Sequence, residues 1–268
     1  MKVLNGAELA AFIKERQAKQ VRGLRQAHGV FPKLVIFVTG ENPVIDTFVR
    51  LKKTYGEDIL IDVDVRRVAL DTLTHDIEAA NTDEKVHGII VQLPLSDPSL
   101  TDSIVSQVAA QKDVDNLGGG DVFVAATPMA IDWLLAGYNV QLKDRKIVIV
   151  GKGRLVGAPL ERLWRGAGLD VTAYDDTEQD LARRLREADI IVSATGVPGL
   201  ITQAMVSPGK VVVDAGTASE GGVIVGDVAH DLRERGDVIL TPVRGGVGPL
   251  TVAALFDNVI AAARATVS

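Results

Sequence analysis

Residues 146–165 read KIVIVGKGRLVGAPLERLWR, and this stretch decides the fold of the second half of the chain. A short apolar run, 146–150, leads through a glycine turn into a helical stretch, 158–165. Glycine lets the backbone turn tightly and approach a pyrophosphate, and the amides and dipole of a helix N-terminus favour its negative charge. The third glycine, Gly157, comes one residue later than in the commonest dinucleotide-binding spacing. Taken alone, the pattern fits an ordinary turn as well, so its context has to decide.

That context is a regular succession of strands and helices. Apolar runs at 171–174, 190–193, 210–214 and 238–240 follow, with helical stretches between them. This is the order expected of a doubly wound parallel sheet. We therefore predict a Rossmann-type dinucleotide-binding domain over residues 119–249, and we expect its cofactor to contact Gly151, Lys152, Gly153, Arg154, Val156 and Gly157.

The charges near the glycine turn bear on which dinucleotide binds. Asp175 lies 24 residues beyond Gly151, at the end of the second predicted strand, where a carboxylate can bind the ribose hydroxyls of NAD and repel a 2′-phosphate. Lys152 and Arg154 supply positive charge for the pyrophosphate or for that 2′-phosphate. The cofactor is thus NAD or NADP, with NAD favoured by Asp175. Asp175 and Asp176 also fit a solvated loop after a strand.

The first half of the chain alternates between helix-like and strand-like segments in the same way. Helices are predicted over 7–27, 43–55 and 73–81, and strands over 33–39, 61–65 and 88–92. Asn42 and Pro43 supply a side-chain cap and a proline at the first helical position. These segments predict an N-terminal α/β domain over residues 1–118. Glycines at 118–120 mark the interdomain connection, and a linker helix is predicted over 128–136.

Composition limits the classes of function. The 268 residues, 47% of them hydrophobic, suffice for two packed cores, and the absence of Cys excludes disulfides, thiolate metal sites and a cysteine nucleophile. The N-terminus lacks the apolar core of a signal peptide, and the longest apolar runs fall short of the roughly 20 residues that span a bilayer. A net charge of −6 offers no basic footprint for nucleic acid. We expect a cytoplasmic protein without membrane or nucleic-acid partners.

Several short motifs occur in an order that resembles the bifunctional methylenetetrahydrofolate dehydrogenase/cyclohydrolases, and the resemblance covers nearly the whole chain. The motifs are VTGENP at 38–43, Lys52, VQLPL at 91–95, KDVD at 112–115, Thr127-Pro128, the glycine segment 151–159, GDV at 226–228 and TPVRGGVGPLT at 241–251. The resemblance implies that the N-terminal α/β domain is the folate-binding catalytic domain and that a cleft separates it from the dinucleotide-binding domain. It also implies a last helix, 250–265, that packs back on the first domain. It also implies a homodimer.

The implied reaction is oxidation of 5,10-methylenetetrahydrofolate with NAD or NADP, followed by hydrolysis of the methenyl product to 10-formyltetrahydrofolate, without a metal. Lys52 would exchange protons, because a partly desolvated amine has a lowered pKa. Gln92 would hold that amine, and the carboxylate of Asp115 would accept paired N–H bonds from the pterin. Without the resemblance, Lys52 reads as a solvated charge and Gln92 as a strand-end cap.

Further site residues follow from the same resemblance. Thr127 would contact the dinucleotide, and the substrate would contact Phe48, Leu93, Pro94, Gly245, Gly246 and Pro249. The loop at 241–249 also fits a plain helix entry, although three glycines in four residues exceed what capping requires. Asp113 is expected to shape its loop, and Tyr55 either to pack or to supply a phenol.

Five departures from the family pattern are expected to border the predicted cleft. Phe48 stands where the family has tyrosine, Gly153 replaces a serine, Arg244 replaces a proline, Ala130 replaces a glycine, and 116–120 replaces a more aromatic segment. Three hypotheses follow: an active dehydrogenase with or without cyclohydrolase activity, a catalytically weakened folate- or nucleotide-binding paralogue, and a Rossmann oxidoreductase for another small substrate. Lys52, Gln92 and Asp115 favour the first.

Overall fold

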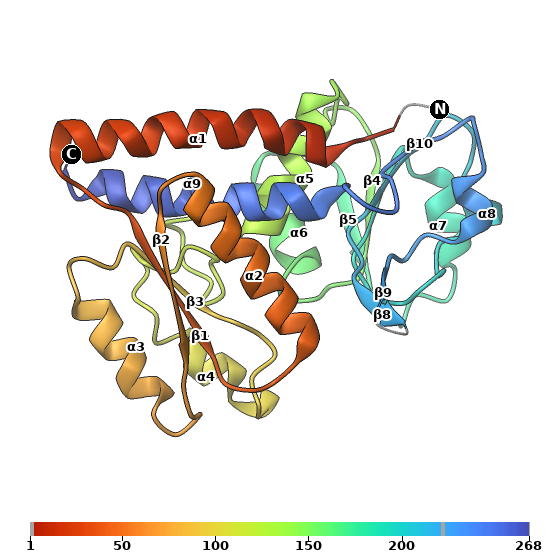
Figure 1. Cartoon of the computed structure of the whole chain (residues 1–268). Helices are drawn as coiled ribbons and strands as arrows, with labels where there is room; N and C mark the ends of the chain where they lie inside the picture. The colour runs from red at the N-terminus through yellow and green to blue at the C-terminus, as the bar shows by residue number, and fades with distance from the viewer. Residues whose placement is uncertain (1–2, 221–222, 268) are drawn as a thin grey trace. The chain divides into compact units, whose positions relative to one another are not determined.

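The structure is a computed structural model that describes residues 3–220 and 223–267 (Figure 1). By internal contacts the chain divides into two compact units. Unit 1 holds Thr127–Thr251 and the described residues of Met1–Ala10, and unit 2 holds Ala11–Ala126 and the described residues of Val252–Ser268. The division thus differs from the predicted domains in two places: the described residues up to Ala10 belong with the dinucleotide-binding unit, and residues 119–126 belong with unit 2. The predicted boundary at 118/119 and the predicted cleft stay predictions.

Unit 1 is built on five parallel strands in the order β10-β7-β6-β4-β5. The strands are β4 (Ile147–Val150), β5 (Val171–Tyr174), β6 (Ile190–Ser193), β7 (Val211–Asp214) and β10 (Ile239–Leu240). Every residue of β4 and of β6 is buried, as expected of central strands covered on both faces. The chain leaves β4 toward β5 on one side and later returns to pair β6 on its other side, so the topological switch point lies between β4 and β6.

Helices cover both faces of this sheet. Figure 1 shows α5 (Ala126–Gly137) and α6 (Gly157–Gly166) on one side, and α7 (Leu181–Glu187) and α8 (His230–Arg233) on the other. A 3-10 helix, η2 (Gln203–Met205), precedes β7, and β8 (Ala218–Glu220) pairs antiparallel with β9 (Val223–Val225). The doubly wound parallel sheet predicted for this half is therefore confirmed. The β8–β9 pair was not predicted, since strands of three residues are too short to show a period.

Unit 2 carries a three-stranded parallel sheet of order β2-β1-β3, formed by β1 (Lys33–Val38), β2 (Asp62–Arg67) and β3 (Gly88–Val91). One face of the sheet packs in an apolar cluster with α3 (Leu73–Thr82) and α4 (Thr101–Val105), which follows η1 (Pro98–Leu100). Helix α2 (Pro43–Asp58) begins as predicted, because Asn42 Oδ1 accepts from Val44 N at 2.9 Å. Gly56 of α2 packs so closely on β2 that a Cβ there would lie 2.4 Å from Val63 Cγ2. The α/β character predicted for this half is confirmed.

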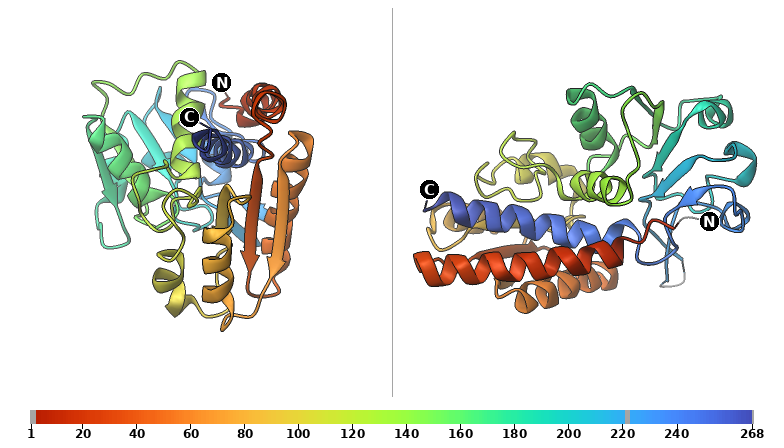
Figure 2. Two further views of the ribbon diagram at one scale, coloured as in Figure 1. Left: turned by 90° about the vertical axis from the view of Figure 1, so that its left-hand side faces the viewer. Right: turned by 90° about the horizontal axis from the view of Figure 1, so that it is seen from above.

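A buried amide joins three helices of unit 2. Gln17 of α1 (Gly6–His28) is fully buried; its Nε2 donates to Ala253 O at 2.8 Å and to Asp257 Oδ1 at 3.1 Å, both in α9 (Val247–Ala265). Its Oε1 accepts from the Tyr55 hydroxyl of α2 at 2.8 Å. Figure 2 shows α1 and α9 side by side along the part that belongs to unit 2. The last helix is thereby tied to the N-terminal half of the chain.

Helix α9 is also, among the described residues, the one helix long and apolar enough to be a candidate membrane span. Its apolar character is accounted for by packing, because 61% of the candidate window is buried inside the structure. Asn258 also indicates that α9 packs within a folded domain, since its Nδ2 donates to the backbone oxygens of Val114 and Val124, each at 2.8 Å. A core helix of a folded domain passes the same length and composition test.

Replacing Gln17 with Leu should destabilise unit 2. The substitution keeps side-chain volume but leaves the buried Tyr55 hydroxyl without its acceptor, and an unmatched buried polar group costs about 1–3 kcal/mol. We expect the free energy of unfolding, measured by denaturant titration, to fall by about 2 kcal/mol.

Tyr55→Phe and the double variant complete the cycle. The Phe ring preserves the stacking on Phe256, whose ring centroid lies 5.1 Å away. Because the double variant, Gln17→Leu with Tyr55→Phe, removes both polar partners, its free energy of unfolding should fall by less than the sum of the falls in the two single variants. Additive losses would contradict the role assigned to this hydrogen bond.

Candidate active site

Lys52 and Gln92 meet in unit 2, as the sequence predicted. Lys52 lies on α2 and Gln92 follows directly after β3, and the ammonium donates from Nζ to Gln92 Oε1 at 2.6 Å. Gln92 is itself fixed, since its backbone N donates to Phe37 O at 2.9 Å and its Nε2 to Leu93 O at 3.1 Å. The side-chain oxygen is therefore presented to Lys52 in a set orientation.

Asp115 provides the opposite charge beside this pair. Burial lowers the pKa of Lys52, while the negative charge of Asp115 works against that shift. Burial likewise raises the pKa of Asp115, and the positive charge of Lys52 opposes the rise. Desolvation is the larger effect on both groups, so each is biased toward its neutral form. An amine biased in this way can take up and release protons closer to neutrality.

The segment that carries Asp115 is held against β3 by its backbone. Ile89 N donates to Lys112 O at 2.7 Å, and the methyls of Val114 pack on Gly88, where a Cβ would lie only 3.0 Å from them. From the other side, Asn258 of α9 donates to Val114 O. Sequence reasoning missed Asn258, although a polar residue within the otherwise apolar stretch of the last helix was a signal.

Asp113 shapes the following loop, as expected. Its carboxylate is buried and accepts from Gly118 N at 2.8 Å and from Leu117 N at 3.2 Å. Asn116 adopts a left-handed backbone (φ 52°) and donates from Nδ2 to Phe123 O at 2.7 Å. The loop that departs from the family pattern is thus ordered by its own side chains.

The ring of Phe48 lies one turn before Lys52 on α2 and is partly buried. Leu93 follows Gln92 and is joined to Pro94 by a cis peptide bond. Tyr55 does not supply the missing phenol at this place. Its hydroxyl is bound to Gln17, its ring stacks on Phe256, and burial raises its pKa. Of the two roles foreseen for Tyr55, the structure shows packing.

The glycine turn of unit 1 has the close packing that only glycine allows. Gly151 has a φ of +100°, and a Cβ there would lie 2.6 Å from Ala194 O. A Cβ on Gly157 would lie 1.8 Å from Gly151 O, so the start of α6 rests on the turn itself. Beside Gly153 a Cβ would meet nothing within 4 Å. A tight turn that leads into a ten-residue helix fits the pyrophosphate of a dinucleotide.

Asp175 is anchored directly after β5. Hydrogen bonds from the side chain of Thr177 and from Lys152, followed by the backbone of Thr177, lower the pKa of Asp175 to about 2. Lys152 Nζ lies 3.1 Å from Asp175 Oδ2, so the ionised carboxylate neutralises a cation of the glycine turn. Among the other predicted cofactor residues, Arg154 and Val156 belong to this turn and Thr127 to the first turn of α5.

The glycine loop after β10 also belongs to unit 1. Gly245 has a φ of +82° and accepts from Ala7 N at 2.9 Å, and a Cβ on Gly6 would lie 1.9 Å from Gly246 O. Pro249 lies in the first turn of α9. The loop therefore contacts the N-terminal segment. Sequence reasoning missed this contact, which Gly6 could have indicated. Of the predicted substrate residues, Gly245, Gly246 and Pro249 are in unit 1, and Phe48, Leu93 and Pro94 are in unit 2.

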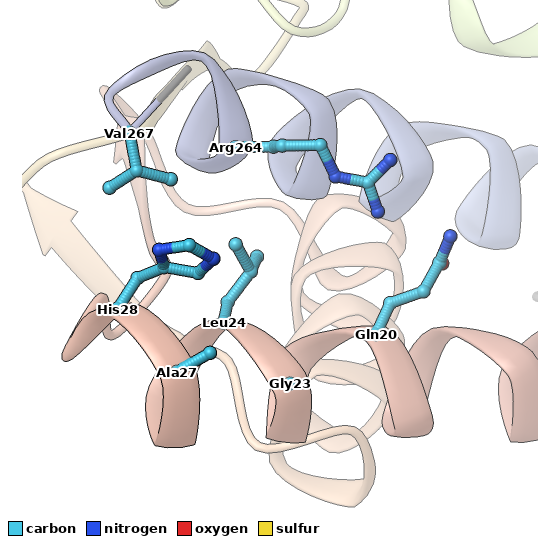
Figure 3. Close-up of a pocket in the computed structure, with 7 residues that line it drawn as sticks. All are labelled: Gln20, Gly23, Leu24, Ala27, His28, Arg264 and Val267. Carbon is cyan, nitrogen blue, oxygen red and sulfur yellow. The ribbon is translucent and has the colours of Figure 1, made fainter.

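A hollow of about 490 Å³ in unit 2 lies away from these groups (Figure 3). It is bordered by α1 and α9, with His28 and Gln20 on the first helix and Arg264 on the second. None of the predicted site residues lines it. This hollow is therefore separate from the candidate site around Lys52, Gln92 and Asp115.

Both halves of the chain match models of one family. Residues 4–115 match the catalytic domain of tetrahydrofolate dehydrogenase/cyclohydrolase, and residues 125–267 match its NAD(P)-binding domain. The bifunctional protein FolD of Exiguobacterium sibiricum is 35% identical over 98% of this chain and 99% of its own length.

Solved structures agree with this match. The bifunctional FolD dehydrogenase/cyclohydrolase of Campylobacter jejuni has a TM-score of 0.93 at 33% identity, over 99% of each chain. The Trypanosoma brucei enzyme, solved in complex with NADP and an inhibitor, has a TM-score of 0.92 at 28% identity over 99% of this chain and 98% of its own. With both of its domains matched in order, this chain belongs to the tetrahydrofolate dehydrogenase/cyclohydrolase family.

Proposed function

We propose that this chain oxidises 5,10-methylenetetrahydrofolate with NAD or NADP and hydrolyses the methenyl product to 10-formyltetrahydrofolate. The observation that carries the proposal is the set of Lys52, Gln92 and Asp115 in the unit that matches the family's catalytic domain. A relative 35% identical over nearly its whole length is named as a bifunctional protein of this family.

Asp115 is placed to hold the folate. An ionised carboxylate accepts two N–H bonds from the amino-pyrimidine edge of a pterin, and such charge-assisted bonds are about twice as strong as neutral ones. Burial raises the pKa of Asp115, and the positive charge of Lys52 opposes that rise, so the ionised form that this role needs depends on Lys52. The partly buried ring of Phe48, one turn before Lys52, offers a face on which the substrate ring can stack.

Lys52 is placed to move the proton of the hydrolytic step. Hydrolysis forms a bond from water oxygen to the methenyl carbon, breaks one of that carbon's two C–N bonds and releases one proton. The Lys52 amine, with a pKa lowered by burial, takes the proton from the attacking water. The hydrogen bond to Gln92 fixes the direction of the amine while this happens.

Unit 1 has the residues to hold the dinucleotide, which supplies the hydride acceptor when bound. The turn at Gly151 and Gly157 and the N-terminus of α6 fit the pyrophosphate. We propose NAD as the preferred cofactor. Asp175 is ionised and paired with Lys152, so its charge opposes a 2′-phosphate and occupies the nearby cation.

A second candidate is a dehydrogenase whose cyclohydrolase activity is weak. Phe48 lacks the hydroxyl that the family's tyrosine carries, and the phenol of Tyr55 is bound to Gln17 instead of replacing it. The ratio of the two activities, assayed separately with methylenetetrahydrofolate and with methenyltetrahydrofolate, distinguishes this candidate from the full bifunctional enzyme.

We further propose that the chain works as a homodimer in the cytoplasm. The dimer rests on the family resemblance, and the compartment on a sequence without Cys, as is common in a reducing compartment. The molar mass in solution, measured by light scattering, tests the dimer, and fractionation of the source cells tests the compartment.

Replacing Lys52 with Met should abolish most cyclohydrolase activity while keeping the helix, because Met retains much of the apolar stem of lysine. General acid–base groups contribute about 100- to 10,000-fold to rate, so we expect a loss of about 100-fold or more in the hydrolysis of added methenyltetrahydrofolate. Lys53→Met, at an exposed neighbouring position, is the matched control and should stay near the parent rate. Equal rates in both variants would refute the role of Lys52.

Replacing Asp115 with Asn should lower the pKa of Lys52 further. The carboxylate raises that pKa by favouring the protonated amine, and Asn removes the charge at nearly constant volume. The limb of any pH dependence that reports Lys52 should therefore move to lower pH. Titration of the labelled lysine side chain by NMR, with Lys52→Met to assign the signal, measures the shift, and an upward shift would contradict the assigned electrostatics.

Replacing Asp175 with Ser should change the cofactor preference toward NADP. The substitution removes the charge that repels a 2′-phosphate and releases Lys152 from its ion pair. We expect the ratio of kcat/KM for NADP to that for NAD to rise about tenfold, a change of about 1.4 kcal/mol. The exposed neighbour Asp176, changed to Ser, controls for loss of general negative charge. An equal rise in both variants would deny Asp175 a specific role.

A further inference from the structure

The GDV motif at 226–228 contains a buried carboxylate that the proposed function does not yet use. Asp227 is fully buried, between β9 and α8. Its Oδ2 accepts from Ser193 Oγ at 2.7 Å, from Thr195 N at 2.7 Å and from Thr195 Oγ1 at 2.9 Å. Ser193 is the last residue of β6, so one oxygen gathers three donors from the end of a central strand.

The backbone that Asp227 holds is at the topological switch point of the sheet. Residues 194–196 follow β6, which pairs with β4, and the glycine turn follows β4. The two loops touch, because a Cβ on Gly151 would lie 2.6 Å from Ala194 O and 3.2 Å from Thr195 Cγ2. In open α/β sheets, dinucleotides bind in the crevice outside these strand ends. A displacement of residues 194–196 would therefore reach the glycine turn directly.

The backbone around Asp227 is fixed by a second carboxylate. Asp214, directly at the end of β7, accepts from Asp227 N at 2.9 Å and from Val228 N at 3.1 Å. Arg233 of α8 forms an ion pair with Asp214 and donates to Thr241 O at 3.1 Å. Asp214 and Arg233 thus secure the 227–228 backbone, while the side chain of Asp227 accepts from Ser193 at the end of β6 and from Thr195 in the following loop.

The other carboxylate oxygen has no such partner. Asp227 Oδ1 is buried without a hydrogen bond from any described residue, and a Cβ on Gly216 would lie 1.9 Å from it. A buried polar atom left unmatched is costly, so a residue needed only to fill this space would better be apolar. The cost has an explanation if the three bonds made by Oδ2 serve the function of the loop.

We propose that Asp227 is a positioning residue that sets the Ala194–Thr195–Gly196 loop for dinucleotide binding. It acts through the loop and does not touch the cofactor itself. This inference rests on the dinucleotide binding of the proposed function. The cofactor site of unit 1 would then include Asp227, which lies in the segment between β9 and α8.

The test is the Kd of Asp227→Ala for NAD and for NADP, measured by calorimetry without folate. Removing the acceptor of three hydrogen bonds should raise the Kd about tenfold or more, as each tenfold corresponds to about 1.4 kcal/mol. Hydrolysis of added methenyltetrahydrofolate depends on Lys52 in unit 2 and should keep the parent rate. That split separates a cofactor effect from general damage to the enzyme.

Asp189→Ala is the matched control. Asp189 lies at the opposite end of the same strand, where its carboxylate accepts from Lys146 N and Lys210 Nζ, each at 3.0 Å. Its loss should lower thermal stability without changing the Kd. If both variants change the Kd equally, or neither does, the positioning role is overturned.

Two milder variants keep the proposal open to refutation if Asp227→Ala does not fold. Ser193→Ala removes one of the three donors with little change of size and should weaken dinucleotide binding by about threefold, less than the loss of one full hydrogen bond. Asp227→Asn retains an acceptor oxygen and should restore much of the affinity lost in Asp227→Ala. A parent-like Kd in Ser193→Ala would overturn the proposal. A parent enzyme that binds neither dinucleotide would instead overturn the proposed function and this inference together.

Discussion

Parallel pairing of strands is the constraint on which both halves of this protein depend. In a parallel sheet all carboxyl ends lie at one edge, and the return connections leave that edge free for loops. Gln92 follows β3 in unit 2, and Gly151, Asp175 and Ala194 follow β4, β5 and β6 in unit 1. Polar residues of distant sequence position therefore meet without being carried there by long loops. Strand β4 itself can be wholly apolar, because no functional group is required of it.

Burial of charge is the second constraint, and its effects differ between the two units. Lys52 and Asp115 are desolvated enough that each is biased toward neutrality, and each partly offsets the bias on the other. Asp175 is exposed and anchored by Thr177 and Lys152, so its pKa falls to about 2 and it stays ionised. Lys52, which must exchange protons, is thus buried, and Asp175, which must keep its charge, is left near water.

Local patterns predicted most of the fold because the deciding signals are local. Asn42 and Pro43 fix the start of α2, and the glycine turn fixes the passage from β4 to α6 within seven residues. The contact between Lys52 and Gln92 was predictable only through the family resemblance, since the two residues are 40 positions apart. The roles of Gln17, Asn258 and Gly6 were missed for the same reason. Each depends on a partner more than 100 residues away, and no period within one element reveals such a partner.

Tyr55 shows why helical spacing alone cannot assign a phenol to a site. It follows Lys52 by three residues, which places the two side chains on neighbouring parts of one helix face. The inward face of a helix such as α2, however, has more than one neighbour. Lys52 meets Gln92 at the end of β3, while Tyr55 meets Gln17 of α1 and Phe256 of α9. Within that face, a side chain turns toward the polar partner that it can reach. A buried hydroxyl without a hydrogen-bond partner costs more free energy than a change of rotamer. Gln17 is that partner, so the oxygen absent from Phe48 is not replaced from the next turn of the helix.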